Sequence, residues 1–130
     1  MSKLSLALVL ALPLSLSSCF LFAAGAVAAG AVGAVSYANN EAWMDTYVPL
    51  QKAWDVSLTS LAENGFTVKG SPMLGATEGA IEAGDAKVTL EKHAEGFVRI
   101  RVRVGTFDTA DNERKTKLVI ESIRSKTEKK

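Results

Sequence analysis

Apolar and polar residues alternate most regularly over residues 98–104, and the same alternation occurs over residues 86–91. A period of two predicts strands that bury one face and leave the other in water. Gly84-Asp85 precedes the first of these segments, and the turn residues 94–96 separate it from the second. The two segments therefore predict neighbouring antiparallel strands joined by a short turn.

Two other segments have apolar residues at helical spacing. The first follows Pro49, which suits the first turn of a helix, and stops at Asn64-Gly65, where glycine suits the C-cap. The second begins near Asp108 or Thr109, either of which can cap it. The predicted buried stripes are Leu50, Ala53, Trp54, Ser57, Leu58 and Leu61 in the first helix, and Thr116, Val119, Ile120 and Ile123 in the second.

Further strands are predicted at residues 41–47, 66–69 and 76–83, with an irregular stretch at 70–75. The expected order is β-α-β-β-β-β-α over residues 37–124, followed by a polar tail at 125–130. Each element has one apolar face, which favours an α+β two-layer sandwich: a mainly antiparallel sheet with two helices on one face. Trp43 and Tyr47 are expected to pack in the core, and the alternative is that they flank the charged face of the sheet.

The N-terminus precedes this domain with an apolar run over residues 4–16 that follows Lys3. A membrane-spanning helix needs about 20 apolar residues, so this run is too short to cross a bilayer by itself. Its length is typical of the apolar region of a secretory signal peptide, and Ser17-Ser18 supply small residues at a cleavage point. Residues 1–18 are therefore predicted to be a signal peptide.

The residues Leu16-Ser17-Ser18-Cys19 resemble the lipobox of bacterial lipoproteins. The resemblance implies cleavage before Cys19 and attachment of a diacylglyceryl group to its sulfur. Cys19 is the only cysteine, so no intramolecular disulfide can form, and acylation explains this thiol better than a free or buried cysteine does.

Residues 20–35 are uncharged and rich in alanine, glycine and valine. We interpret residues 19–36 as the lipidated cysteine followed by a membrane-proximal tether. A helical membrane insertion is the alternative, because residues 4–35 form one long uncharged stretch, and small residues four apart permit close helix packing.

Charge and composition exclude several functions. Cleavage before Cys19 removes Lys3 from the 15 basic residues and leaves 14, equal to the 14 acidic ones. A formally neutral protein shows no electrostatic signature of nucleic-acid binding. With a single cysteine and a single histidine, His93, the chain offers no metal site, and no motif indicates a cofactor. His93 is expected on the surface, without a nucleophile motif.

Arg99, Arg101 and Arg103 form the one charged feature of note. Alternation places all three on one sheet face, about 6.5–7 Å apart. The predicted hairpin sets Glu91 near Arg99 and Lys87 near Arg103, so one end of the row is neutralised and the other is basic. An ordinary solvated face is the favoured interpretation, and an anion-binding strip is the alternative.

Much of the chain, about residues 16–124, resembles small bacterial lipoproteins grouped as domain of unknown function 3568. The residues that carry the resemblance are Cys19, Trp54, the turn Glu63-Asn64-Gly65-Phe66 and the string Arg103-Val104-Gly105-Thr106-Phe107. Family members usually continue with Gly-Asp, whereas Asp108 follows directly here. The resemblance implies an envelope lipoprotein and supplies no catalytic residues.

We therefore expect a lipid-anchored cell-envelope protein that is a non-enzymatic interaction or structural module. Its expected partners are the membrane, through Cys19, and an envelope protein or the cell wall. The domain would face the periplasm, and Phe20 rather than Asp after the cysteine resembles the outer-membrane sorting of Gram-negative lipoproteins, which implies the outer membrane. The alternatives are a small periplasmic ligand-binding protein or enzyme, and a protein held by an uncleaved N-terminal membrane helix.

Overall fold

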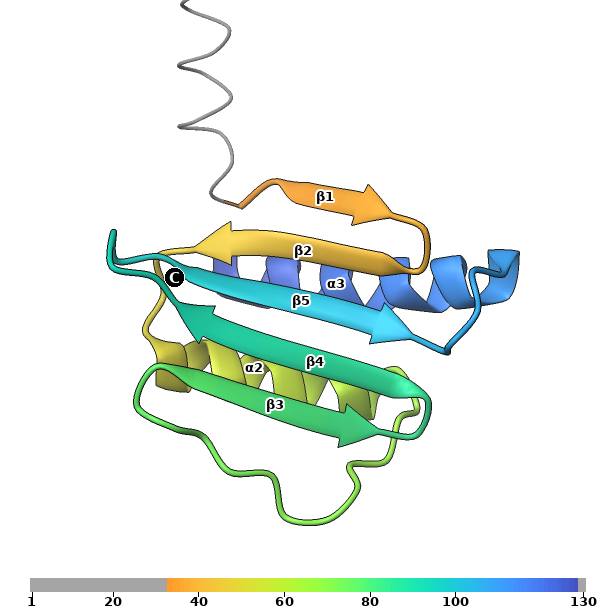
Figure 1. The fold of residues 1–130 in the computed structure, drawn as a ribbon, viewed down its shortest axis with the longest axis horizontal. Helices are drawn as coiled ribbons and strands as arrows, with labels where there is room; N and C mark the ends of the chain where they lie inside the picture. The colour runs from red at the N-terminus through yellow and green to blue at the C-terminus, as the bar shows by residue number, and fades with distance from the viewer. Residues whose placement is uncertain (1–32, 129–130) are drawn as a thin grey trace, which may run out of the picture. The chain divides into compact units, whose positions relative to one another are not determined.

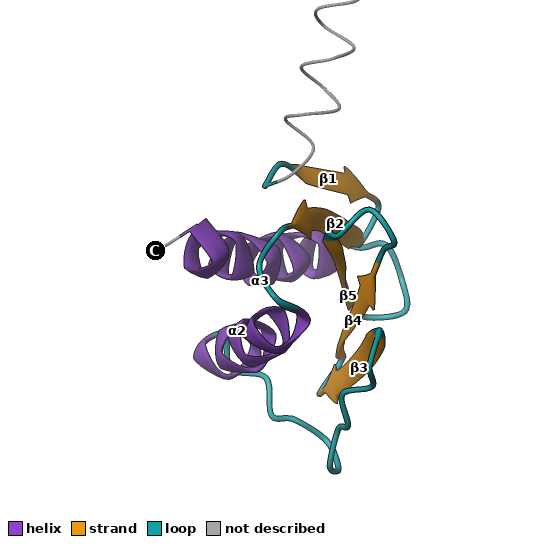
Figure 2. Cartoon of the chain, turned by 90° about the vertical axis from the view of Figure 1, so that its left-hand side faces the viewer, coloured by secondary structure: helices purple, strands orange, loops and turns teal. Residues whose placement is uncertain are grey.

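The computed structural model describes residues 33–128, which form a five-stranded sheet with two helices against one face (Figures 1 and 2). Neighbouring strands are all antiparallel, in the spatial order β1-β2-β5-β4-β3. The elements are β1 (Val35–Ala38), β2 (Glu41–Thr46), α2 (Leu50–Glu63), β3 (Glu78–Ala83), β4 (Ala86–Lys92), β5 (Val98–Val104) and α3 (Ala110–Glu128). The predicted α+β two-layer architecture is confirmed.

The order of the elements is β-β-α-β-β-β-α, which differs from the predicted order at two places. Residues 35–38 form an edge strand, whereas the sequence predicts residues 35 and 36 to be part of the tether. Asn39 adopts a left-handed backbone with φ 57°, which turns β1 back onto β2. The other difference is residues 66–69, where the predicted strand is wrong.

The segment 66–69 lies outside the named strands and pairs with β3 only through a bridge between Val68 and Ala83. Gly65 and Gly70 flank it with φ of 85° and 66°, so the chain changes direction at both ends and the segment stays short. It nevertheless covers the outer edge of β3, since the Lys69 amide donates to the Glu82 carbonyl at 2.8 Å.

The hydrophobic core lies between the sheet and the helices. In Figure 2 both helices stand on the same side of the sheet, with α2 against β3 and β4 and α3 against β2 and β5. Trp54, only 6% exposed, is buried as predicted. It packs so closely on β3 that a Cβ on Gly79 would lie 2.7 Å from the indole, so this strand position requires glycine.

The end of α2 and the start of α3, both predicted from the sequence, have recognisable caps. The Phe66 amide donates to the Leu61 carbonyl at 2.9 Å across Gly65, which has the left-handed backbone common after a helix C-terminus. At the start of α3, the Thr109 hydroxyl accepts a hydrogen bond from the Asn112 amide at 3.2 Å. Thr109 therefore caps α3.

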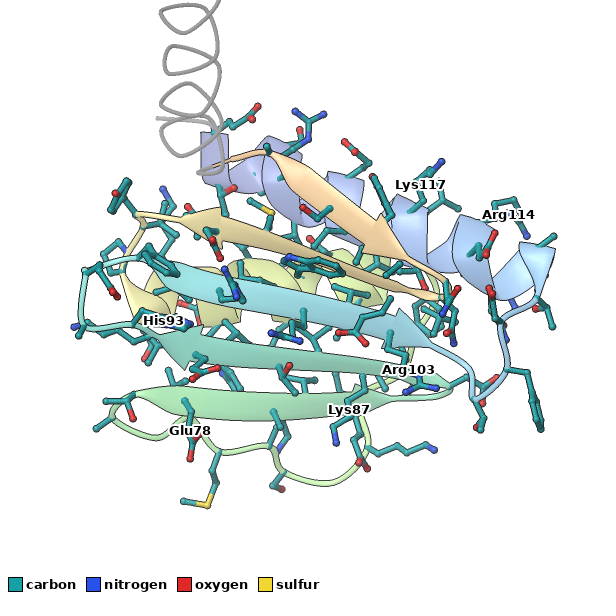
Figure 3. The ribbon with its side chains drawn as sticks, turned by 45° about the horizontal axis from the view of Figure 1, so that its top comes forward. Glu78, Lys87, His93, Arg103, Arg114 and Lys117 are labelled. Carbon is teal, nitrogen blue, oxygen red and sulfur yellow. The ribbon has the colours of Figure 1, made fainter. Side chains whose placement is uncertain are left out.

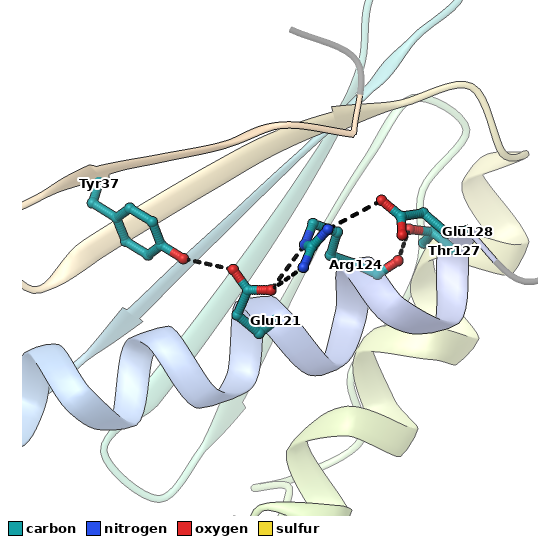
Figure 4. Close-up of polar contacts among 5 residues, drawn as sticks. All are labelled: Tyr37, Glu121, Arg124, Thr127 and Glu128. Carbon is teal, nitrogen blue, oxygen red and sulfur yellow. Dashed lines mark hydrogen bonds and ion pairs between the residues drawn. The ribbon is translucent and has the colours of Figure 1, made fainter. Parts of the chain in front are cut away.

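Helix α3 continues through Glu128, beyond the expected end at Arg124. Polar contacts hold this last turn: the Arg124 guanidinium bonds to Glu121 at 2.6 and 2.8 Å and to Glu128 at 3.3 Å, and the Thr127 hydroxyl donates to the Arg124 carbonyl (Figure 4). Tyr37 joins the same network from β1 by donating its hydroxyl to Glu121 at 2.9 Å. Within residues 33–128, neither helix has the length and apolar character needed to span a membrane.

Candidate functional site: the open face of the sheet

The sheet face opposite the helices, here called the open face, carries most of the polar side chains of the strands. The register aligns these side chains in three rows that cross the sheet. One row is Ala38, Glu41, Arg103, Lys87 and Glu82; the second is Ser36, Trp43, Arg101, Thr89 and Ala80; the third is Asp45, Arg99, Glu91 and Glu78. The three arginines of β5 therefore share one face, as predicted.

Arg99 is fully engaged by a carboxylate. Its Nε and Nη2 donate to Asp45 Oδ1 and Oδ2 at 2.8 and 3.0 Å, a bidentate pair between β5 and β2. The Asp45 side chain is 11% exposed and that of Arg99 29%. This hydrogen bonding raises the pKa of Arg99 further above its ordinary value, so the guanidinium stays charged and paired.

The predicted cross-strand neighbour of Arg99, Glu91, does lie opposite it in the β4–β5 register. No ion pair within 4.0 Å joins the two among the described residues, because the bidentate pair with Asp45 turns the guanidinium toward β2; Glu91 instead lies 3.9 Å from His93 Nε2. The predicted register is confirmed, and the expected ion-pair partner is wrong.

Arg101 forms a more exposed pair. Its Nη1 donates to Glu41 Oε1 at 3.3 Å, and both side chains are partly in water. Trp43 lies directly opposite Arg101 on β2, half-buried on the open face. Tyr47 is 65% exposed just after β2. The expectation that both aromatic residues pack in the core is wrong, because the register turns Trp43 outward and Tyr47 follows the end of the strand.

Arg103 differs from the other two arginines. Its Nη2 donates to the backbone carbonyl of Thr106 at 3.0 Å, and no carboxylate of residues 33–128 lies within ion-pair distance of it. Glu41 is opposite Arg103 in the register but bonds to Arg101 instead. On the other side, Arg103 faces Lys87 of β4 (Figure 3).

The whole open face carries four basic and five acidic side chains, so it is not a basic surface. The basic residues are Lys87, Arg99, Arg101 and Arg103, and the acidic ones are Glu41, Asp45, Glu78, Glu82 and Glu91. The geometry of Arg99 and Arg101 fits an ordinary ion-paired sheet face. Only the Arg103 end keeps the features expected of an anion-binding strip.

A hollow of about 650 Å³ lies at that end, where the β3–β4 turn meets the connection from β5 to α3. Its charged lining residues are Lys69, Glu82, Asp85, Lys87 and Arg103. The exposed ring of Phe107 is also part of the lining. Sequence reasoning missed this hollow, since its residues come from segments far apart in the chain.

The wall of the hollow is a rigid turn. Gly105 has φ 74°, and a Cβ there would collide with Asn112, so the turn requires glycine. The Gly105 amide donates to the Asp85 carbonyl at 2.9 Å. The buried Asn40 side chain donates to the carbonyls of Val104 and Gly105, each at 2.9 Å. Of the residues 103–107 that carry the family resemblance, the first two therefore end β5 and the last three form its hydrogen-bonded connection to α3.

His93 is half-buried rather than exposed, which corrects the prediction of a surface residue. Its ring stacks on Phe97, with centroids 4.5 Å apart, and Nε2 has no hydrogen-bond partner in the described part of the chain. Across residues 33–128, no group of three His, Cys, Asp or Glu side chains is arranged to hold a metal ion. Cys19, the predicted lipidation residue, lies outside the described residues.

Comparison with known proteins gives a family but no activity. No curated protein matches the chain. The family model described as protein of unknown function DUF3568 matches residues 3–125, which is nearly the whole sequence. With the two-layer domain and the fixed Arg103–Phe107 turn in place, this match establishes that the chain belongs to the DUF3568 family.

Proposed function

We propose that this protein is a lipid-anchored cell-envelope protein whose α+β domain is a non-enzymatic interaction or structural module. The observation that carries the proposal is the short apolar run over residues 4–16 that ends in Leu16-Ser17-Ser18-Cys19. The family match supports it, because that match begins at residue 3 and includes this N-terminal region. The acyl groups on Cys19 would supply the membrane attachment, since two or more chains anchor stably where one binds marginally.

The position of the first strand fits a domain held near a membrane. Fifteen residues separate Cys19 from Val35, where β1 begins. A chain of that length spans at most about 50 Å. The domain would therefore work within this distance of the bilayer, on its periplasmic side. Phe20 after the cysteine favours the outer membrane.

Replacement of the cysteine tests the anchor. Cys19→Ala should leave an uncleaved precursor that incorporates no labelled palmitate, because the acylated sulfur is gone. Ser18→Ala is the matched control, since it keeps a small residue next to the cleavage point and should leave processing and labelling intact. Labelling of cells followed by gel electrophoresis and membrane fractionation gives the readout.

Labelled palmitate on the Cys19→Ala chain, together with cleavage at the ordinary place, would contradict the lipid anchor. The same gel addresses the uncleaved-helix alternative, because a wild-type chain that keeps its full length and takes up no label would be held by its N-terminal segment instead. The ligand-binding alternative is favoured by one structural observation, the hollow beside Arg103.

A further inference from the structure

Two cations face each other on the open face without a carboxylate between them. Lys87 and Arg103 are direct cross-strand partners in the β4–β5 register, and like charges placed opposite each other destabilise a sheet. Glu82 is opposite Lys87 on its other side, yet no ion pair joins them within residues 33–128. Glu41, opposite Arg103, bonds to Arg101.

A third cation lines the same hollow. Lys69 comes from the loop that covers the edge of β3, and its amide fixes the backbone there by donating to the Glu82 carbonyl at 2.8 Å. No ion pair of Lys69 occurs among the described residues. Three cations from three segments therefore line one hollow, and each keeps hydrogen-bond donors for a ligand.

The rest of the lining limits the kind of ligand. Glu82 and Asp85 also belong to it, so the charged residues sum to about one positive charge, which suits a small anion rather than a polyanion. The Phe107 ring is 76% exposed at the same hollow and offers an apolar surface beside the cations. A single exposed ring is ordinary on a protein surface, so Phe107 enters the argument only through its position beside the three cations.

We propose that this hollow binds an oxyanion, a phosphate or carboxylate, that is attached to a ring or another apolar group. Arg103 and Lys87 hold the oxyanion by charge-assisted hydrogen bonds, Lys69 adds a third donor, and the apolar group lies on Phe107. The site deepens the proposed interaction module by naming the chemistry of its partner. It does not require the lipid on Cys19, so the two proposals can fail separately.

The test is a titration of the full chain in neutral detergent micelles, followed by the backbone amide signals in nuclear magnetic resonance spectra. Three probes separate the sources of the anion: inorganic phosphate, phenyl phosphate, and phosphatidylglycerol added to the micelles. We expect saturable shifts at Lys87, Arg103 and Thr106, with phenyl phosphate bound more tightly than inorganic phosphate. Added salt should weaken this binding.

Substitutions then assign the site. Lys87→Gln with Arg103→Gln should weaken phenyl phosphate binding by at least about tenfold. Phe107→Ala should remove the preference for phenyl phosphate over inorganic phosphate. The matched control is Arg114→Gln with Lys117→Gln, which removes the same charge from α3 and should leave the affinity unchanged (Figure 3).

The Lys87/Arg103 double variant should unfold at the wild-type midpoint or slightly above it, because it removes two like charges that face each other, and this separates loss of binding from loss of fold. The proposal is overturned if no probe gives saturable shifts, or if the Lys87/Arg103 variant binds as the wild type does. Tight binding of phosphatidylglycerol alone would assign the site to a lipid headgroup. Binding of phenyl phosphate without binding of the lipid would assign it to a soluble or cell-wall anion.

Discussion

The two faces of the sheet are stabilised by different interactions. The helix face is apolar, with Met44, Ile81, Ile100 and Val102 each at most 1% exposed. The open face holds charged rows in which some groups are paired across strands and others are not. The difference teaches that the fold depends on the first face, whereas the second is free to carry recognition. Substitutions should therefore cost the most stability on the helix face and less on the open face.

The largest expected effect is on the helix face. Trp54→Ala removes a buried indole and leaves a cavity between α2 and Gly79, which should lower the free energy of unfolding by about 3–5 kcal/mol. Trp43→Ala is the matched control, because the same residue type is removed from the open face, where about 1 kcal/mol is expected. Denaturant unfolding of both variants gives the comparison. Equal losses for the two tryptophans would contradict the assignment of the faces.

A smaller loss of stability is expected at the partly buried ion pair of the open face, Asp45 with Arg99. Asp45→Asn leaves the half-buried Arg99 guanidinium without its carboxylate, and we expect a loss of about 1–3 kcal/mol. Glu41→Gln removes the equivalent partner of the exposed Arg101 and should cost about 0.5 kcal/mol or less. If denaturant unfolding gave similar losses for both variants, burial would not be what distinguishes the two pairs.

The smallest effect concerns alkaline pH and the edge strand β1. Burial and the hydrogen bond to Glu121 raise the pKa of Tyr37 from 10.0 to about 12. A raised pKa means that the folded protein binds the phenol proton more tightly than the unfolded chain does. The contribution to stability is therefore complete below pH 10 and is lost as the pH rises to about 12.

Near-ultraviolet absorbance of the phenolate should show one tyrosine ionising near pH 12, and this transition should be absent in Tyr37→Phe. The exposed Tyr47 supplies the control, since Tyr47→Phe should leave the transition of Tyr37 in place. A Tyr37→Phe protein that retains the high transition would show that Tyr37 is not the group with the raised pKa.

The sequence predicts the parts of the fold that depend on local patterns. Alternation over residues 98–104 identified β5, and the spacing of Val119, Ile120 and Ile123 identified the buried side of α3. The prediction was wrong for short segments whose composition fits more than one kind of structure. Residues 66–69 have strand-like composition but turn at both glycines, and β1 was hidden because it adjoins the uncharged stretch and Asn39 was not recognised as its turn.

The candidate site was predictable only as far as the β4–β5 hairpin extends. Turn position sets the register of a hairpin, so the pairs Glu91–Arg99 and Lys87–Arg103 followed from the sequence. The partner of Arg99 on β2, Asp45, could not be predicted in this way, because it lies 54 residues earlier in the chain. That pairing depends on the strand order, which no local pattern encodes. The same pairing with β2 leaves Arg103 without a carboxylate partner among the described residues, because Glu41 bonds to Arg101.

The edge position of β1 matters if the N-terminal segment is ever under mechanical tension. A pull on the chain before Val35 would reach β1 first, and β1 is joined in the sheet only to β2. None of its four side chains is fully buried, so its detachment would remove only Val35 from the margin of the core, break the Tyr37–Glu121 hydrogen bond and leave the buried cluster in place. Asn40 stays bound to the Val104 and Gly105 carbonyls, so the released residues are 35–38, which would lengthen the connection by about 13 Å. The strand would thus extend under load and leave the rest of the domain folded.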